Sequence, residues 1–549
     1  MITTAAPDHA AVRALRDARR RKRLVSLEWF ELAYKVYVVA LVAIVAVALL
    51  ANLVGDARLD ENQVGDVVRL TPAVVGSVMA LALALGLRSG ARGGPISVEQ
   101  PDVQYLLLAP VSRRAVLSRP AVQQFRLAAF AGAAVGAVGG QLLGRRLNRA
   151  LIPWTVMGAA AGATIGLALV AAALLAHVVH LRRWQATLVG AVLLGWQAAG
   201  IPNDWGVPGP LDTVGSLVLW PLRTHVVDLA GPVLVLSAAA LALLGLERLS
   251  IDALSRRSAL VSQLRFAVTM RDLRTVVLLR RQLSNEQHRV RPWFRTPRLV
   301  RKPVTRRGVQ SIARFPLGRV IRMVLLAGVT AAAQVIAFRG TTPMVVVSGL
   351  AAFVLGLECV EPFAQEIDRP ERCEALPQQR GWLLVRHLPV PAAVAAVFGL
   401  LGVAGIVALH RTAMSWHLGL LLVLPVVWAG AAGAVLNVMS GLPEPVAAGA
   451  VNDMLPPEVA GVREVLRTVK PLAVAISGSL PVLVARAAVR RGDQPVPPTL
   501  QAVVAVGLVI AAVAWWARKR DDVKLKFGAL WAAGDAEFRA RHSRAGGSR

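Results

Sequence analysis

The chain has 549 residues, of which 55% are hydrophobic and 17% charged, and its mean hydropathy is +0.56. Soluble domains hold about 45–50% apolar and about 25% charged residues, so this balance excludes an ordinary soluble protein. Several apolar blocks are about 20 residues long, which is enough to cross a hydrocarbon core of roughly 30 Å. The sequence therefore predicts an all-α, polytopic membrane protein.

The formal net charge is +30, and the basic residues cluster between the apolar blocks. This pattern is typical of cytoplasmic loops beside an anionic membrane surface, and it favours the lipid bilayer over nucleic acid as the partner. The two cysteines, Cys359 and Cys373, have no C-x-x-C pattern around them, so we expect neither a disulfide nor a metal site.

Residues 1–35 form a basic N-terminal segment with an aromatic edge that includes Trp29, Phe30 and Tyr34. The segment has two interpretations: an amphipathic helix on the inner membrane surface, or a plain positive anchor for the first span. Polar and basic residues precede the first apolar run, which does not resemble a cleavable signal peptide.

Residues 36–246 are predicted to form a first module of six spans. We expect these spans at about 36–54, 71–87, 125–144, 153–178, 185–201 and 226–246. Small residues at four-residue spacing in the third and fourth spans favour close helix packing. The loop 201–225 is expected on the outside. Arg145, Arg146 and Arg149 fall in another loop that alternation places outside, which conflicts with their charge. Either this short hairpin breaks the positive-inside rule, or one of the adjoining segments does not cross the membrane fully.

Residues 247–316 hold 17 Lys and Arg against four acids, and we expect a cytoplasmic linker there. A second six-span module is predicted at 317–517. Its spans are expected at about 317–338, 343–360, 391–409, 417–439, 471–488 and 499–517. The basic tail, 518–549, completes the chain. The prediction is about twelve transmembrane helices in two six-helix pseudo-repeats in the cell membrane, with both termini cytoplasmic.

One short element occurs twice, 267 residues apart, as PVSRRAVLSR (Pro110–Arg119) and PQQRGWLLVR (Pro377–Arg386). Both copies fit P-x-x-R-x-x-x-L-x-R, and each follows the second span of its module. Pro110 is expected to begin a short helix, and Pro120 to end it. The shared residues are Pro110, Arg113, Leu117 and Arg119 in the first copy, and Pro377, Arg380, Leu384 and Arg386 in the second.

Motifs for chemistry are missing from the sequence. No lysine follows a glycine, so there is no P-loop, and neither G-x-S-x-G nor H-E-x-x-H occurs. We therefore expect no enzyme activity and no cofactor in this chain. Arg322 is expected to snorkel from its span. Acids precede the second copy of the element, and we expect them to form a solvated, locally paired cytoplasmic face: Glu361, Glu366, Asp368, Glu371 and Glu374.

The repeated element has two interpretations. Its arginines either serve membrane topology alone, or they dock on an acidic groove of a partner that moves the adjoining spans.

The segments Leu108–Leu117 and Leu376–Leu384 resemble the "L-P-x-s-R-x-x-x-L" segment of permease subunits of ATP-binding cassette exporters that lack a fused ATPase. In that family the segment forms the coupling helix that touches the ATPase subunit. The resemblance implies docking by Arg113, Arg114, Arg119, Arg380 and Arg386, with ATP used by the partner. Residues 8–35 and 201–225 look similar to the surface helix and the re-entrant segment of the family.

The composition is similar to that of actinobacterial permeases, but two modules share one chain, and Gly381-Trp382 replaces Arg114-Ala115. One chain as a complete transmembrane unit and a homodimer both stay open. The expected function is an exporter permease for a hydrophobic or amphipathic substrate. Its alternatives are an ion-coupled secondary transporter and a membrane scaffold that transports nothing.

Overall fold

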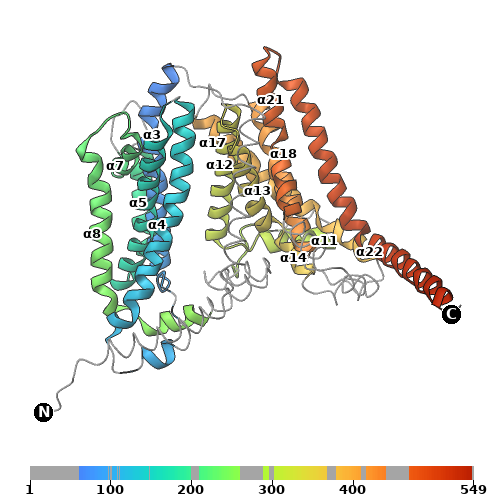
Figure 1. Cartoon of the computed structure of the whole chain (residues 1–549), viewed down its shortest axis with the longest axis horizontal. Helices are drawn as coiled ribbons and strands as arrows, with labels where there is room; N and C mark the ends of the chain where they lie inside the picture. The colour runs from blue at the N-terminus through green and yellow to red at the C-terminus, as the bar shows by residue number, and fades with distance from the viewer. Residues whose placement is uncertain are drawn as a thin grey trace. The chain divides into compact units, whose positions relative to one another are not determined.

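The computed structural model describes residues 61–96, 98, 102–107, 109, 112–147, 149–199, 209–259, 289–295, 302–367, 379–409, 416–440 and 469–546. Within these ranges all regular structure is helical (Figure 1). The chain divides into two compact units. Unit 1 comprises Met1–Val45 and Asp56–Asn285, and unit 2 comprises Ala46–Gly55 and Glu286–Arg549. The division at residue 285 falls inside the predicted linker 247–316.

Nine helices of the described ranges are long and apolar enough to cross a membrane, and each coincides with one of the predicted spans. They are Val67–Gly90, Arg113–Arg146, Leu151–Val178, Val226–Arg248, Leu317–Phe338, Arg380–Ala408, Trp416–Met439, Val469–Arg490 and Val496–Lys526. A membrane-embedded, all-helical chain is thereby confirmed.

The other three predicted spans differ from these nine. The span at 36–54 lies outside the described residues, as does the basic segment 1–35. Helix α6 (Arg183–Ala199) has 17 residues, or about 26 Å at 1.5 Å per residue, and is slightly short for a membrane core of roughly 30 Å. The span expected at 343–360 is α13 (Met344–Cys359), which meets α14 (Glu361–Ile367) at a 60° bend.

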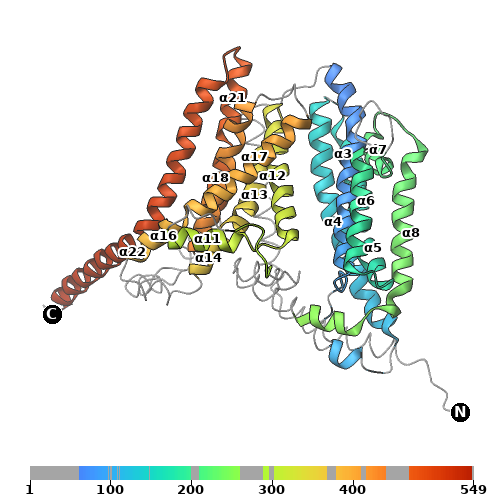
Figure 2. The ribbon, with the colours of Figure 1, turned by 180° about the vertical axis from the view of Figure 1, so that it is seen from behind.

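Unit 1 is organised around one central helix, α5, which packs against α3, α4 and α8 (Figures 1 and 2). Its elements in chain order are α3 (Glu61–Gly90), η1 (Asp102–Leu106), α4 (Arg113–Arg146), α5 (Leu151–Val178), α6, α7 (Asp212–Ser216), η2 (Leu217–Leu219), η3 (Val226–Leu229), α8 (Ala230–Leu244) and η4 (Gly245–Arg248).

Glycines bring α4 and α5 into backbone contact. A Cβ atom on Gly136 would overlap the carbonyl oxygen of Gly158, and one on Gly132 would overlap that of Gly162. Lipid offers no hydrophobic force between helices, so close van der Waals packing of this kind holds membrane helices together. The small-residue spacing in the sequence therefore predicted this packing correctly.

The connection between α6 and α8 packs into unit 1. Val214 and Leu219 in this connection are buried. Gln197 at the end of α6 donates from Nε2 to Oδ1 of Asp212 at 2.6 Å and accepts from the Leu211 N–H at 3.2 Å. These bonds join the connection to α6, so the described part of the loop expected at 201–225 is a packed segment.

Unit 2 has α18 at its centre, packed against α12, α13, α17 and α22 (Figure 2). Its elements are α11 (Pro303–Ile312), α12 (Leu317–Phe338), α13, α14, α16 (Arg380–His387), α17 (Pro389–Leu409), α18 (Trp416–Met439), α21 (Leu480–Arg490) and α22 (Val496–Gly546). Helix α22 has 51 residues, or about 76 Å, and extends beyond the other helices of the unit.

The span Val469–Arg490 is interrupted at its middle. A turn at residues 478–479 separates the helical residues 469–477 from α21. Ser479 is fully buried at this break, and its hydroxyl accepts a 2.7 Å hydrogen bond from Nε2 of Gln334 on α12. The same Nε2 donates to the hydroxyl of Ser348 on α13 at 2.8 Å. Uncharged polar side chains thus connect three spans inside the unit.

Parts of the predicted linker and tail are ordered elements of the units. Leu249 and Leu254 belong to the core of unit 1, and Phe315 belongs to that of unit 2. The tail expected at 518–549 continues α22 as a helix to Gly546. The basic composition marked these segments as lying outside the spans, but it did not show which residues pack.

Candidate partner-docking site

The first copy of the repeated element begins a long helix. Helix α4 starts at Arg113, and Arg113 and Arg114 are exposed in its first turn. Leu117 is fully buried in the core of unit 1, whereas Arg119 is partly exposed. Pro110 lies outside the described residues. Arg119 thus lies on the side of α4 opposite Leu117, whereas Arg113, four residues before Leu117, is exposed because it begins the helix.

The predicted end of this helix at Pro120 is wrong. Helix α4 continues through Pro120 to Arg146 as one 34-residue helix. Proline lacks an amide hydrogen and removes one helical hydrogen bond, but membrane helices tolerate it where neighbouring groups satisfy the freed carbonyl. The first copy is therefore the exposed start of a span and not a separate short helix.

The second copy begins a helix in the same register. Helix α16 starts at Arg380, and Leu384 is 3% exposed. Arg386 is exposed on the other side of α16, beside the exposed ring of Trp382. Pro377 lies outside the described residues. Unlike the first copy, this one is a short helix of 8 residues, and α17 follows it directly.

The residues before the two helices also have similar backbones. Ser112 has φ −59° and ψ 126°, and Gln379 has φ −55° and ψ 132°. In both copies the first arginine therefore occupies the first helical position, and the shared leucine occupies the fifth and points into its unit. The sequence match of the described positions corresponds to a match in local structure.

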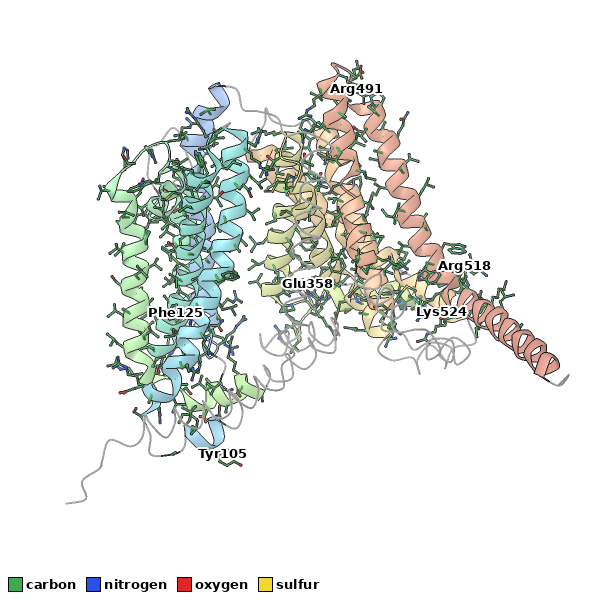
Figure 3. The ribbon with its side chains drawn as sticks, viewed as in Figure 1. Tyr105, Phe125, Glu358, Arg491, Arg518 and Lys524 are labelled. Carbon is green, nitrogen blue, oxygen red and sulfur yellow. The ribbon has the colours of Figure 1, made fainter. Side chains whose placement is uncertain are left out.

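Helix α22 contributes to the second copy. A Cβ atom on Gly381 would overlap the backbone carbonyl of Arg518, so only glycine allows α16 to lie this close to α22. The Trp382 ring contacts two cations, with the guanidinium carbon of Arg386 at 4.9 Å and that of Arg518 at 5.1 Å from its centroid. Figure 3 labels Arg518 on α22.

These contacts explain why the second copy departs from the first at Gly381-Trp382. The sequence did not indicate Arg518 as part of the site. Its only signal was a basic run directly after the last apolar block.

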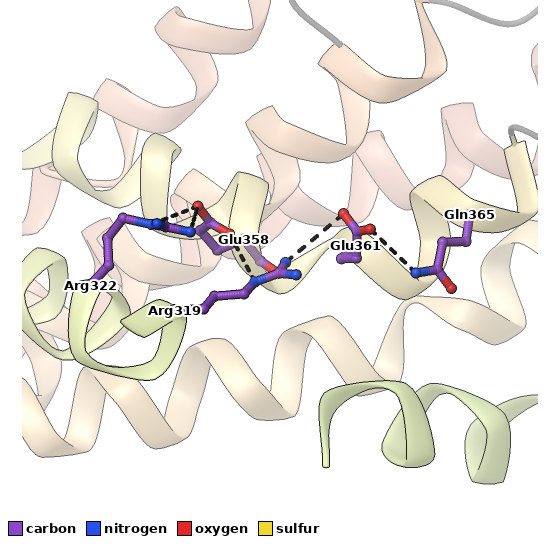
Figure 4. A network of polar contacts seen from close by, with 5 residues as sticks. All are labelled: Arg319, Arg322, Glu358, Glu361 and Gln365. Atoms are coloured by element: carbon purple, nitrogen blue, oxygen red, sulfur yellow. Dashed lines mark hydrogen bonds and ion pairs between the residues drawn. The ribbon is translucent and has the colours of Figure 1, made fainter. Parts of the chain in front are cut away.

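A buried ion network lies beside this site, where α12 begins and α13 ends (Figure 4). Arg319 is 2% exposed, and its Nε lies 2.9 Å from Oε2 of Glu358. Its Nη2 donates to the backbone carbonyl of Glu358 at 2.7 Å. Arg322 contacts the other carboxylate oxygen of Glu358 at 2.8 Å. Arg322 is therefore paired within the protein, and the prediction that it snorkels is wrong.

The network continues into α14. Oε2 of Glu361 lies 3.9 Å from Nη2 of Arg319, and Oε1 of Glu361 accepts from Gln365 at 3.3 Å. Further along, Glu366 pairs with Arg307 of α11 at 3.3 Å. Glu361 and Glu366 are paired, but they are buried, so only the solvated part of the expectation is wrong for these two acids. The other three, Asp368, Glu371 and Glu374, lie outside the described residues.

The network links the second copy to the spans. Helix α16 contacts α11 and α14, which both carry members of the network, and the network ends on α12 and α13. Buried charges keep a defined arrangement, because separating one from its partner leaves an unpaired charge in a low dielectric. Helix α16 thus packs against two helices whose charged side chains connect to α12 and α13.

Sequence reasoning missed Arg307 and Arg319. Two signals were present: arginines three residues apart at the start of an apolar run, and acids three residues apart at the end of the next one. Residues three apart share a helix face, and α12 and α13 are antiparallel neighbours, so the two pairs can meet.

Among the described residues, no group of three or more His, Cys, Asp or Glu side chains is placed to hold a metal ion. Comparisons of the chain with protein-family models, with curated proteins and with solved structures found no match.

Proposed function

We propose that this protein is the permease subunit of an ATP-binding cassette exporter and that separate ATPase subunits dock on the two copies of the repeated element. In this proposal the chain has about twelve spans in two pseudo-repeated modules of six, and its basic ends are cytoplasmic. The substrate is a hydrophobic or amphipathic molecule. The chain binds no nucleotide itself.

Similar helix packing in the two units supports the repeat. In unit 1, α5 packs against α3, α4 and α8, and in unit 2, α18 packs against α13, α17 and α22 in the same chain order. The contact of α4 with η4 has a counterpart in that of α16 with α22. Each copy of the element thus lies beside the end of the last span of its own unit.

The observation that carries the proposal is the shared anchoring of the two copies, although Arg113 is exposed and Arg380 is only partly exposed, with its Nη2 buried. In each, an apolar pair anchors the first helical turns in the unit: Val116 and Leu117 in one, Leu383 and Leu384 in the other. The last arginine of each copy, Arg119 or Arg386, keeps exposed surface. A rigid anchored helix that presents cations fits an acidic groove on a partner and can transmit its motion.

Co-purification tests the proposal. The full-length chain is expressed with each candidate P-loop ATPase subunit of the same genome, and any complex is isolated in mild detergent. We expect the ATPase to co-purify with the wild type and to be lost with Arg113→Glu combined with Arg380→Glu, because reversed charges repel an acidic groove.

Matched controls come from the opposite ends of the spans. Arg145 is exposed at the far end of α4, and Arg491 lies at the other end of unit 2 from Glu358 and Arg518 (Figure 3). Arg145→Glu combined with Arg491→Glu makes the same charge change away from both copies and should leave the ATPase bound. Binding that survives reversal at Arg113 and Arg380 would overturn the proposal.

A second candidate, ion-coupled transport, is favoured by the break in the span Val469–Arg490. Secondary transporters commonly bind substrate or ions at discontinuous helices near the membrane midplane. Here Ser479 and Gln334 gather at such a break. Transport that continues without any ATPase, and that stops when an uncoupler collapses the ion gradient, would favour this candidate.

A further inference from the structure

The basic end of unit 1, where α4 begins and α8 ends, contains a cation that has no counter-charge among the described residues. The helical residues 251–259 follow η4 and lie across this end of the unit (Figures 1 and 2). Two polar contacts fix them in place. The Ser250 N–H donates to Nε2 of His177 at 3.4 Å, and the Ser258 hydroxyl donates to the carbonyl of Val98 at 2.5 Å. Leu249 and Leu254 bury their side chains in the core of the unit.

The loop after α3 shapes the other side of this contact. Gly93 and Gly94 have φ of 117° and 77°, a backbone region that favours glycine. A side chain on Gly94 would also meet Nδ1 of His177 at 2.6 Å. The loop can therefore lie against the imidazole ring, and the same histidine accepts the hydrogen bond from Ser250. The contacts of Ser250 and Ser258 hold the helical residues 251–259 in place, and Arg257 lies one residue before Ser258.

Arg257 is only partly exposed, and its Nε is buried without a hydrogen-bond partner among the described residues. No carboxylate in these ranges pairs with it, and burial lowers the pKa of its guanidinium from the usual value. Arg256, the preceding residue, is exposed, and its Nε donates to the carbonyl of Asp252 at 3.3 Å. A half-buried guanidinium without an anion is costly, so a ligand of opposite charge would stabilise this end of the unit.

The surroundings point to a lipid. The spans Leu151–Val178 and Val226–Arg248 end here, which is where phosphate headgroups lie when the spans are in a bilayer. The last turns of α8 keep apolar side chains exposed, with Leu241 at 61% and Leu244 at 58%, as expected of a surface that meets acyl chains. Basic pockets at the cytoplasmic ends of spans are typical binding sites for anionic headgroups.

We propose that Arg257 binds the phosphate of an anionic phospholipid at the basic end of unit 1. The guanidinium supplies a planar pair of N–H donors that matches phosphate oxygens. Unit 2 has the opposite arrangement at its own basic end, because Glu358 and Glu361 already neutralise its buried arginines. The lipid site is therefore a property of unit 1, and it does not depend on the ATPase proposed above.

Thermal unfolding of the purified full-length chain tests the proposal. The protein is held in a neutral detergent, and dioleoylphosphatidylglycerol or dioleoylphosphatidylcholine is added at equal concentration. We expect phosphatidylglycerol to raise the melting temperature of the wild type and of Arg256→Gln above the value with phosphatidylcholine. This additional increase should be lost in Arg257→Gln.

The same experiment separates a lipid ligand from a structural role. Without phosphatidylglycerol, Arg257→Gln should melt at or above the wild-type temperature, because the substitution removes an unpaired charge and leaves no partner behind. A variant that melts well below the wild type would show an internal partner and overturn the proposal. So would an equal effect of phosphatidylglycerol on both variants, or an equal increase from inorganic phosphate at matched ionic strength.

Native mass spectrometry of the wild-type chain gives a measurement that needs no variant. At least one phosphatidylglycerol should stay bound after phosphatidylcholine has dissociated. A chain that loses both lipids, or keeps both equally, would contradict the proposal. If Arg257→Gln weakens only co-purification with the ATPase, the anion is a carboxylate of that partner, and the lipid assignment is wrong.

Discussion

At the scale of single residues, Glu358 neutralises arginine charge at the basic end of unit 2, where α12 begins and α13 ends. It contacts two arginines, of which Arg319 is almost completely buried and Arg322 is partly exposed. An exposed partner can turn to water when its ion pair is broken, whereas a buried one cannot. The two arginines should therefore respond differently when the network is cut.

We predict that Glu358→Gln lowers the stability of the chain by about 3–5 kcal/mol, because it leaves the buried guanidinium of Arg319 without its main counter-charge. Arg322→Gln should cost about 1 kcal/mol or less, since its side chain is 23% exposed and the bond between Glu358 and Arg319 stays. Thermal unfolding in detergent measures both changes. Equal losses in the two variants would show that Arg319 does not depend on Glu358.

The sequence predicted few of these contacts, for a physical reason. Arg322 and Glu358 are 36 residues apart and lie on different helices. Their contact depends on the rotation of α12 and α13 about their axes, which a nearly uniform apolar pattern does not specify. The expectation that Arg322 snorkels followed from its place near a span end. It failed because the guanidinium of Arg322 pairs with the carboxylate of Glu358 inside the protein.

At the scale of elements, the close packing of α4 against α5 depends on glycines, which have no side chain larger than a hydrogen atom. Gly136 and Gly139 lie in the same helix and only three residues apart. A Cβ atom on Gly136 would overlap the backbone of α5, whereas one on Gly139 would meet nothing within 4 Å. The pair separates the effect of helix packing from that of helix propensity.

We predict that Gly136→Ala destabilises the chain by about 1–3 kcal/mol, since the added methyl forces the two backbones apart. Gly139→Ala should be neutral or stabilise the helix by up to about 1 kcal/mol, because alanine is the better helix former. Melting temperatures and the yield of monodisperse protein in detergent check the difference. Equal behaviour of the two variants would mean that α4 and α5 do not approach as closely as the structure shows.

Helix positions were predictable because apolar length defines them. The span expected at 317–338 is the helix Leu317–Phe338. Local breaks were harder. Pro120 was expected to end a helix and does not, whereas a turn at residues 478–479 interrupts a span that looks uniform in the sequence. Membrane helices tolerate proline and breaks where neighbouring groups satisfy the freed backbone, and a single segment of sequence does not contain that information.

At the scale of the whole molecule, the two ends of the spans differ in charge. The ends that carry Arg113 and Arg386 also carry most of the basic loops, and the positive-inside rule places such ends in the cytoplasm. Three arginines oppose this assignment: Arg145 and Arg146 in the last turn of α4, and Arg149 in the loop after it. Helix α4 has 34 residues and begins at Arg113, so these arginines lie about 50 Å from that end. A helix of this length has its two ends on opposite sides of a membrane.

Cysteine labelling in intact cells tests this topology. Cys373 is replaced by serine, and Cys359 is kept because it is fully buried. We predict that Arg145→Cys and Arg491→Cys react with an impermeant maleimide added outside, whereas Arg113→Cys and Arg386→Cys react only after the membrane is opened. The end of α4 with Arg145 and Arg146 and the short loop 147–150 with Arg149 then lie outside despite these arginines, because the many basic residues at the other ends outweigh them. Labelling of Arg113→Cys from outside would show that the orientation is the opposite one. Both copies of the element would then lie out of reach of a cytoplasmic ATPase.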